Sequence, residues 1–307
     1  MQHFRSLEKI HLQDAWLTIG SFDGVHRGHQ KILQKLTTGA RSAGAPVVVL
    51  TFDPHPIVVL RPEKPPSFLT TPQEKARLLG KLGVDIVVIH PFDREVASHS
   101  ARAFLSRLKA HLNFTQFWVG YDFAMGQNRE GDIPALRRLG AEMGYELKVI
   151  SPVEVDGQVI SSSQIRALLT GGQVREAFGL LGRPYRVGGM VIEGAKRGHT
   201  IGIPTANLDI EASRVVPYRG VYVCQAHVNG QAWDAVANIG IRPTFESDPD
   251  IPSVEAHLLD FSGDDLYGKV VQLDFITRLR GEQKFPNVQT LIEQIHTDIA
   301  RAREILA

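Results

Sequence analysis

Between Leu17 and Ile150, short apolar segments alternate with segments of helical periodicity, and this alternation restricts the possible folds more than any other feature. The apolar segments are apolar throughout, so strands formed by them would be buried on both faces, as in a parallel sheet covered by helices on both sides. We expect strands at 17–19, 47–52, 86–89, 117–119 and 147–150, and helices near 72–82, 101–112 and 132–144, after a first helix with Ile32, Leu33, Leu36 and Ala40 on one stripe. The N-terminal part is therefore predicted to be a parallel α/β domain.

The pattern changes in the second half of the chain. Two short helices, 163–169 and 174–181, are expected to end at Gly182-Arg183-Pro184, a typical helix stop. Alternating strands then follow around the turn Asn229-Gly230, so residues 185–276 predict a small antiparallel β-barrel. A terminal helix, expected to pack on the barrel, carries Val288, Leu291, Ile292, Ile295 and Ile299 on one face. The predicted domains are 1–182 and 183–307.

The composition fits two domains and limits the partners. Its 307 residues exceed one domain of about 150 residues. A net charge of +1 weighs against a sequence-independent grip on nucleic acid, and no apolar segment is long enough to cross a bilayer. The first residues lack the apolar run of a secretory signal, and the single Cys224 cannot form an internal disulfide. We expect a cytoplasmic protein without nucleic-acid or membrane partners, and the sequence leaves its oligomeric state open.

The densest motif follows the first buried strand and opens the first long helix. It reads Gly20-Ser21-Phe22-Asp23-Gly24-Val25-His26-Arg27-Gly28-His29. Its glycines allow close approach of a ligand to the backbone, and a helix start offers free N–H groups to an anion. His26 and His29, three residues apart, could donate hydrogen bonds to a phosphoryl group during transfer. The alternatives are surface histidines or a zinc site, but zinc needs further ligands and the only cysteine lies far along the chain.

Three other motifs fall at positions that suit a ligand. Thr51-Phe52-Asp53-Pro54-His55-Pro56 and Gly120-Tyr121-Asp122-Phe123 follow expected strands, at the edge where open α/β sheets bind ligands. The first of them is equally well explained as a rigid proline-bounded turn. Ser161-Ser162-Ser163-Gln164-Ile165-Arg166 places hydroxyls at a helix start with an arginine nearby, more than helix capping needs.

A second constellation lies beyond residue 182. Gly194-Ala195-Lys196-Arg197-Gly198 is a basic glycine-rich loop, and Pro204-Thr205-Ala206-Asn207 follows it. Thr205 and Asn207 point the same way from an extended segment, and their oxygens suit Mg²⁺ on a nucleotide. Asn238 and Glu255 lie in later strands. Glu255 stands in an apolar strand, where a carboxylate is more often an outward-facing solvated residue than a buried base.

These motifs resemble a known family. A His-X-Gly-His sequence opening a helix is similar to the nucleotidylyltransferases with a Rossmann-like sheet. Together with ThrPheAspProHisPro and IleSerSerSerGlnIleArg, it resembles the N-terminal module of bacterial bifunctional riboflavin kinase/FMN adenylyltransferases. The resemblance implies that FMN attacks the α-phosphorus of ATP to give FAD and pyrophosphate. It gives His26, His29 and Arg166 phosphate-stabilising roles. It places the remaining nucleotide- and flavin-binding positions at Gly20, Phe22, Asp23, Gly24, Asp53, Asp122, Ser162 and Ser163.

The C-terminal motifs resemble riboflavin kinase. They are ProThrAlaAsn, AsnIleGlyXXProThr, ValGluXHis, AspLeuTyrGly and LeuArgXGluXXPhe, in this order. The resemblance implies phosphorylation of riboflavin to FMN by ATP, with Glu255 as general base and Thr205 and Asn207 as Mg²⁺ ligands. It places Arg280 beside the flavin. It assigns nucleotide or flavin binding to Gly194, Lys196, Arg197, Gly198 and Asn238.

The chain departs from the family at a few positions. His199 replaces a second basic-loop arginine, which predicts weaker or pH-dependent ATP binding, and Ile203 replaces a phenylalanine before ProThrAlaAsn. Ala124-Met125 interrupts an aromatic-rich segment, which bears on flavin stacking. Two other readings remain: an adenylyltransferase whose barrel only binds flavin, and a non-catalytic flavin carrier or regulator of flavin-sensing RNA. The near-neutral charge weighs against RNA, and a carrier needs no histidine pair at a phosphate site.

Overall fold

The structure is a computed structural model, and it describes residues 1–63, 66–155, 157–194, 202–241, 252–263 and 265–307. The chain divides into two compact units, Met1–Ser162 and Ser163–Ala307. The helices α7 (Ser162–Thr170) and α8 (Val174–Leu181) thus belong almost entirely to the second unit. The boundary predicted after Gly182 is a boundary between catalytic modules and not between compact units, and it stays a prediction.

The first unit contains a parallel sheet, as predicted, with six strands where five were expected. Its strand order is β1-β4-β3-β2-β5-β6. The strands are β1 (Gln2–Phe4), β2 (Trp16–Ile19), β3 (Val47–Asp53), β4 (Ile86–Pro91), β5 (Gln116–Gly120) and β6 (Glu146–Ile150). The chain runs from β2 towards β3 and β4 on one side, and later from β5 to β6 on the other. The sheet's topological switch point is therefore between β2 and β5, where open α/β sheets bind ligands at the carboxyl ends of the strands.

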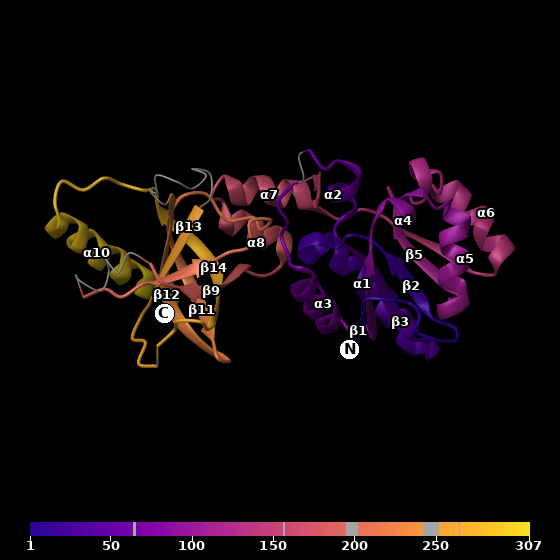
Figure 1. The fold of residues 1–307 in the computed structure, drawn as a ribbon, viewed down its shortest axis with the longest axis horizontal. Helices are drawn as coiled ribbons and strands as arrows, with labels where there is room; N and C mark the ends of the chain where they lie inside the picture. Colours follow the sequence, from indigo (N-terminus) through magenta and orange to yellow (C-terminus); the bar gives the residue numbers. More distant parts are fainter. Residues whose placement is uncertain (64–65, 156, 195–201, 242–251, 264) are drawn as a thin grey trace. The chain divides into compact units, whose positions relative to one another are not determined.

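Helices cover both faces of this sheet (Figure 1). On one face α1 (Arg27–Ala43) and α3 (Pro72–Lys81) share a core with Val47, Val49 and Val87. On the other face α5 (Ala101–Leu112) and α6 (Ile133–Met143) pack on alternate residues of the same strands, including Val48 and Val88. This two-sided burial explains why the strands read as continuous apolar runs.

Several short elements were not predicted. They are β1, the helices α2 (Pro56–Leu60) and α4 (Arg94–Ser98), the 3-10 turns η1 (Asp23–Val25) and η2 (Gln127–Arg129), and the hairpin strands β7 (Glu154–Val155) and β8 (Gln158–Val159). Each has at most five residues, too few to show a period of its own.

The second unit contains the predicted barrel. Six strands close in the order β10-β13-β12-β11-β14-β9, with antiparallel pairing throughout. They are β9 (Tyr185–Ile192), β10 (Ala206–Asp209), β11 (Gly220–Val228), β12 (Gln231–Ile241), β13 (Pro252–Leu258) and β14 (Val270–Arg280). Asn229 and Gly230 connect β11 to β12 with φ of 50° and 80°, so the predicted two-residue turn is confirmed.

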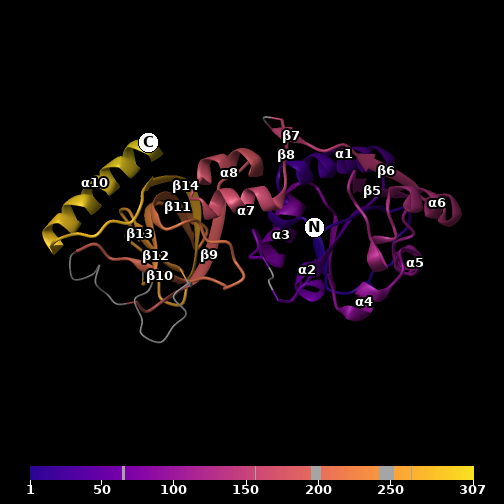
Figure 2. The same cartoon turned by 90° about the horizontal axis from the view of Figure 1, so that it is seen from above.

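The terminal helix α10 (Val288–Leu306) packs on the outside of the barrel, as Figure 2 shows. Its packing face is the predicted one, since Ile299 contacts the barrel core and Leu291, Ile292 and Ile295 are half-buried, but the predicted Val288 is not part of it. Val288 is 58% exposed, whereas Ala302 is fully buried with Val221, Val223 and Val236. Ile299, Ile305 and Leu306 complete this contact. The C-terminal half of the helix therefore provides most of the docking.

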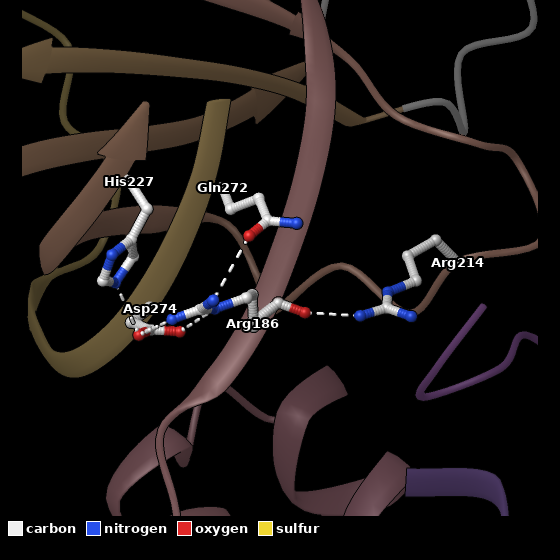
Figure 3. A network of polar contacts seen from close by, with 5 residues as sticks. All are labelled: Arg186, Arg214, His227, Gln272 and Asp274. Atoms are coloured by element: carbon white, nitrogen blue, oxygen red, sulfur yellow. Dashed lines mark hydrogen bonds and ion pairs between the residues drawn. The ribbon is translucent and has the colours of Figure 1, made fainter. Parts of the chain in front are cut away.

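A polar network ties three strands together on the outer wall of the barrel (Figure 3). The guanidinium of Arg186 on β9 binds both carboxylate oxygens of Asp274 on β14, and its Nη1 donates to Gln272 Oε1 at 3.2 Å. His227 Nε2 on β11 lies 2.9 Å from Asp274 Oδ2. Arg214 donates to the backbone oxygen of Arg186. Because Leu273 and Phe275 point inward and are fully buried, Asp274 faces outward and joins neighbouring strands.

No helix within the described ranges is long and apolar enough to span a membrane.

Candidate active sites

The loop after β2 has an unusual backbone. Phe22, Gly24 and Val25 have φ of 47°, 78° and 41°, and the first and last of these carry a side chain in the left-handed region. Such conformations are costly for bulky residues and gather at functional loops. The loop lies at the carboxyl end of β2, beside the switch point, and leads directly into α1.

The histidine pair is built by the first turn of α1. His26 is the N-cap residue, and its Nδ1 accepts a hydrogen bond from the backbone N–H of His29 at 3.4 Å. The two rings stack with centroids 3.7 Å apart and planes inclined by 20°, and the Phe22 ring lies at 62° to the His29 ring with centroids 5.1 Å apart. Because Nδ1 of His26 accepts, a neutral His26 carries its proton on Nε2. The pair is therefore held in one geometry by the helix start and by Phe22.

His29 is held in its neutral form. Burial lowers the pKa of His29 well below its usual value, and the charges of His26 and Lys75 act in the same direction. Within the described part of the chain, Nδ1 of His29 is buried without a hydrogen-bond partner. A neutral imidazole with one unused buried nitrogen can donate to or accept from a ligand group.

Asp23 anchors the loop to the segment that precedes α3. Its carboxylate is almost fully buried and accepts hydrogen bonds from the backbone N–H groups of Leu69 and Thr70, at 2.9 and 3.1 Å, and from Thr70 Oγ1 at 3.1 Å. Thr70 Oγ1 in turn accepts from Gly24 N–H at 3.1 Å. These contacts fix the position of the loop, and a direct role of Asp23 in ligand binding stays a prediction.

Ser162 also meets this loop, since its Oγ donates to the backbone oxygen of Asp23 at 3.0 Å. The structure therefore brings together, within the first unit, the predicted residues Gly20, Phe22, Asp23, Gly24, His26, His29 and Ser162. Ser163 and Arg166 belong to the second unit, where Arg166 Nη1 lies 3.5 Å from Ser163 Oγ. Their part in the same site stays a prediction.

Asp53 and Asp122 end two strands at the carboxyl edge of the sheet. Asp53 closes β3 before a cis peptide bond to Pro54 and lies 3.6 Å from the exposed Arg5. Asp122 follows β5, and its backbone oxygen accepts from Arg129 at 3.2 Å. Met125, one of the departures from the family pattern, packs half-buried against the core of the first unit.

Sequence reasoning missed Lys75. It is 5% exposed, and its Nζ donates to Thr51 Oγ1 at 3.1 Å, while Thr51 Oγ1 donates to the backbone oxygen of Ser21. Burial lowers the pKa of Lys75 to about 8, against the opposing charges of Asp23 and Asp53. The available signal was a lysine on the apolar face of a helix, four residues before the fully buried Leu79.

In the second unit, three predicted residues form one row across the barrel. Asn207 on β10 pairs with Glu255 on β13, and Glu255 pairs with Asn238 on β12. Directly opposite residues of neighbouring strands point to the same face. Their chain neighbours Ala206, Ala256 and Ile239 are buried, so the row lies on the outer face of the barrel. Glu255 is half-buried on this outer face. Its burial is thus intermediate between the two sequence-based alternatives, a solvated residue and a buried base.

The segment with Thr205 is fixed from two sides. A Cβ at position 194 would overlap the side-chain amide of Asn207, so the backbone of Gly194 lies directly against that amide. His257 Nδ1 lies 2.7 Å from the backbone oxygen of Pro204. Ile203 is buried, where the family carries a larger apolar residue. Lys196, Arg197, Gly198 and His199 lie outside the described residues.

Arg280, at the end of β14, is held by the terminal helix. Its Nε and Nη2 bind the carboxylate of Asp298 on α10 at 2.8 to 3.1 Å, and Nη1 donates to Gly281 O at 3.0 Å. The guanidinium lies 5.8 Å from the centre of the Phe285 ring. Arg280 is thus held rigidly, and its contact with flavin stays a prediction.

Comparisons with known proteins give the family of the chain. Two family models match the chain, FAD synthetase over residues 8–164 and riboflavin kinase over residues 181–306. The bifunctional riboflavin kinase/FMN adenylyltransferase of Pseudomonas fluorescens is 40% identical over 291 residues, which cover 94% of this chain and 92% of the relative. The chain belongs to this bifunctional family. The bifunctional riboflavin kinase/FMN adenylyltransferase of Bacillus subtilis is 38% identical over 299 residues, which cover 96% of this chain and 94% of the relative.

A solved structure extends the likeness to the whole fold. The crystal structure described as a macrolide-efflux protein from Streptococcus pneumoniae has a TM-score of 0.87 and 31% identity, and it covers 98% of each chain. Membership of the bifunctional riboflavin kinase/FMN adenylyltransferase family makes the chain an enzyme with both activities, with riboflavin, FMN and ATP as substrates. The fold class and function predicted from the sequence are confirmed.

Proposed function

We propose that the stacked His26/His29 pair performs the adenylyl transfer by stabilising charge on the transferring phosphoryl group. A phosphate oxygen of FMN forms a bond to the α-phosphorus of ATP, and the bond from that phosphorus to the bridging oxygen breaks, releasing pyrophosphate. Negative charge builds on the α-phosphoryl oxygens, where imidazole N–H groups and the first N–H groups of α1 would donate hydrogen bonds. No protein nucleophile is required.

The observation that carries this proposal is the geometry of the pair. Two imidazoles stacked 3.7 Å apart in the first turn of a helix, at the carboxyl end of β2, present donors where an anion is favoured. By the family resemblance Ser163 and Arg166 add phosphate contacts, and Asp53 and Asp122 line the nucleotide and flavin pocket.

For the kinase reaction, Glu255 is the proposed general base. It would accept the proton of the ribityl 5′-hydroxyl as that oxygen attacks the γ-phosphorus of ATP, and ADP would leave. Glu255 is supported by its place in the middle of the Asn207–Glu255–Asn238 row, where two amide residues lie opposite it on the neighbouring strands. Arg280, held by Asp298, would lie beside the flavin.

Mg²⁺ is the cofactor that the donor set fits. Thr205 and Asn207 offer a hydroxyl and an amide oxygen, the hard donors that Mg²⁺ prefers. Because Gly194 has no Cβ, the side-chain amide of Asn207 packs directly against its backbone. The proposed ligand Asn207 is therefore oriented before any metal binds. When bound, Mg²⁺ would neutralise charge on the ATP phosphates. Lys196, Arg197 and Gly198 are proposed to contact the same phosphates.

The test supplies purified protein with riboflavin, ATP and Mg²⁺ and follows FMN and FAD by chromatography. Glu255→Gln should abolish FMN formation and preserve FAD synthesis from supplied FMN. His26→Asn with His29→Asn should preserve FMN formation and abolish FAD synthesis. The absence of both products with the unmodified protein would refute the proposal, and loss of both activities in one variant would contradict separate sites.

A further inference from the structure

Lys75 stands in a position that is unfavourable for a lysine on three counts. It is 5% exposed, although lysines are almost never buried without a partner. It lies in the first turn of α3, where the positive end of the helix dipole disfavours a cation. Among the described residues, its ammonium has one hydrogen-bond acceptor, Thr51 Oγ1, and forms no ion pair. An ammonium has three N–H donors, so two remain unused there.

The surroundings of Lys75 are those of the adenylyl-transfer site. The helices α1 and α3 share one core on the same face of the sheet, as Figure 1 shows, and both begin at its carboxyl edge. His29 lies in the first turn of α1, and the charge of Lys75 lowers the pKa of His29. Thr51 links Lys75 to the backbone of Ser21 in the loop after β2.

The charged and titratable groups around Lys75 come from three elements, η1, β3 and α1. Asp23 belongs to η1, Asp53 to the end of β3, and His26 and His29 to the start of α1. The carboxylate of Asp23 is already engaged by Leu69 and Thr70. The buried ammonium of Lys75 has N–H donors without acceptors in the part of the chain that the structure describes, and it lies near the histidine pair. An anionic ligand bound there would compensate its charge.

We propose that Lys75 is the fixed positive charge of the adenylyl-transfer site and positions a phosphate group of ATP or FMN at the histidine pair. This inference rests on the proposed function of that pair and adds a residue to it. The ammonium lies in a desolvated place where a charge acts on a phosphate far more strongly than it would in water. The site then needs Lys75 in its protonated form.

The test compares three variants of the full chain in FAD synthesis from supplied FMN. Lys75→Met removes the charge, Lys75→Arg keeps it, and Thr51→Val removes the hydrogen bond but keeps the charge. We expect kcat/KM to fall about 100-fold in Lys75→Met, as for loss of one preorganised donor. Lys75→Arg should retain at least about 10-fold more activity than Lys75→Met, and Thr51→Val should lose less than Lys75→Met.

The pH profile separates charge from shape. Since Lys75 has a pKa of about 8 in the free enzyme, kcat/KM for FAD synthesis should fall as the pH rises through that value. This alkaline limb should disappear in Lys75→Met and move to higher pH in Lys75→Arg, whose guanidinium stays protonated. A bound phosphate favours the charged lysine, so the limb in kcat should lie at higher pH than the limb in kcat/KM.

The kinase reaction of the same preparations is the internal control. FMN formation from riboflavin should be unchanged in all three variants, which shows that the second unit is folded, and a cooperative urea transition followed by the fluorescence of Trp16 and Trp118 shows that the first unit is folded. Wild-type rates in Lys75→Met would overturn the proposal, as would an alkaline limb that Lys75→Arg leaves in place. Equal losses in Thr51→Val and Lys75→Met would also overturn it, because the hydrogen bond and not the charge would then matter. If the unmodified protein makes no FAD, it is the proposed function of the histidine pair that fails.

Discussion

Gly194 shows how one missing methyl group can fix the position of a proposed metal ligand. The Asn207 amide occupies the space that a Cβ at position 194 would take. Gly194→Ala should displace this amide, at small cost in stability because a side-chain end can move. Misplacing a ligand-side group by about 1 Å can reduce rates about 100-fold, so we expect FMN formation to fall about 10- to 100-fold. FAD synthesis from supplied FMN should not change.

Gly179 provides the matched control. It lies within α8 of the same unit, and a Cβ there would meet no atom within 4 Å. Gly179→Ala should raise the free energy of unfolding by up to about 1 kcal/mol, from helix propensity, and leave both activities intact. Both variants are compared by urea unfolding and by product chromatography. Equal kinase rates in the two variants would show that Asn207 needs no fixed position.

His29 predicts a pH dependence of stability with a definite sign. Its native pKa lies well below the value of about 6.5 in an unfolded chain. Below about pH 6.5 the unfolded chain therefore binds a proton that the native state does not. The free energy of unfolding should fall as the pH drops from about 6.5 towards the native pKa, by up to about 1.4 kcal/mol per pH unit.

His29→Gln should flatten this dependence. The measurement is urea unfolding of the full chain at about pH 7.5 and about pH 5.5, on either side of the unfolded pKa. His90, whose pKa burial also lowers, contributes in the same direction, so His90→Gln should flatten the curve separately. An unchanged slope in His29→Gln would mean that His29 is protonated in the native state.

At the scale of elements, one buried ion pair joins the barrel to α10. The side chains of Arg280 and Asp298 are 16% and 7% exposed, and Gln294 Nε2 donates to Asp298 Oδ1 at 2.9 Å. Removal of one partner leaves a buried charge uncompensated. Asp298→Ala and Arg280→Ala should each lower the free energy of unfolding of the second unit by about 3–5 kcal/mol.

The double variant should lose less than the sum of the single losses, since neither charge remains unpaired. Denaturant unfolding of the four proteins gives the coupling energy. Additive losses would show that the pair contributes only through packing. Asp298→Ala should also raise KM for riboflavin in the kinase reaction if Arg280 lies beside the flavin, whereas KM for FMN in the other reaction should not change.

The elements show where sequence patterns are sufficient and where they are not. The buried strands of the sheet could be predicted because two-sided burial leaves no alternation, and the turn at Asn229-Gly230 because few residues accept its backbone. The extent of the α10 contact could not, since periodicity shows which residues share a face and not which part of the helix meets Val221 and Val236. The helix α2 depends on local contacts, including the His55 side chain, which accepts from Ile57 N–H at 3.2 Å.

The same distinction applies to the candidate sites. His26 and His29 could be predicted from a motif at the start of a helix. The row formed by Asn207, Glu255 and Asn238 could not, because strand register is a tertiary property that residue spacing does not encode. Lys75 was missed because its burial depends on the packing of α3 against the sheet. The positions of these residues depend on contacts between segments far apart in the chain, which local sequence patterns do not predict.

At the scale of the whole molecule, each unit has its own sheet and its own core; the first carries the histidine pair and the second the Asn207–Glu255–Asn238 row. The product of the kinase, FMN, is the substrate of the adenylyltransferase. If the two reactions are chemically independent, a chain deficient in one should be complemented by a chain deficient in the other. This prediction concerns the intact protein and needs no separate domains.

The experiment mixes Glu255→Gln with the His26→Asn/His29→Asn double variant and supplies riboflavin, ATP and Mg²⁺. Alone, the first should form neither flavin nucleotide from riboflavin, and the second should accumulate FMN. Mixed, they should form FAD after a lag, because FMN must first be released and build up in solution. Adding excess unlabelled FMN to a reaction with labelled riboflavin should dilute the label in FAD. A mixture that accumulates FMN and forms no FAD, although the Glu255→Gln protein converts supplied FMN, would show that the FMN made by one chain is withheld from another.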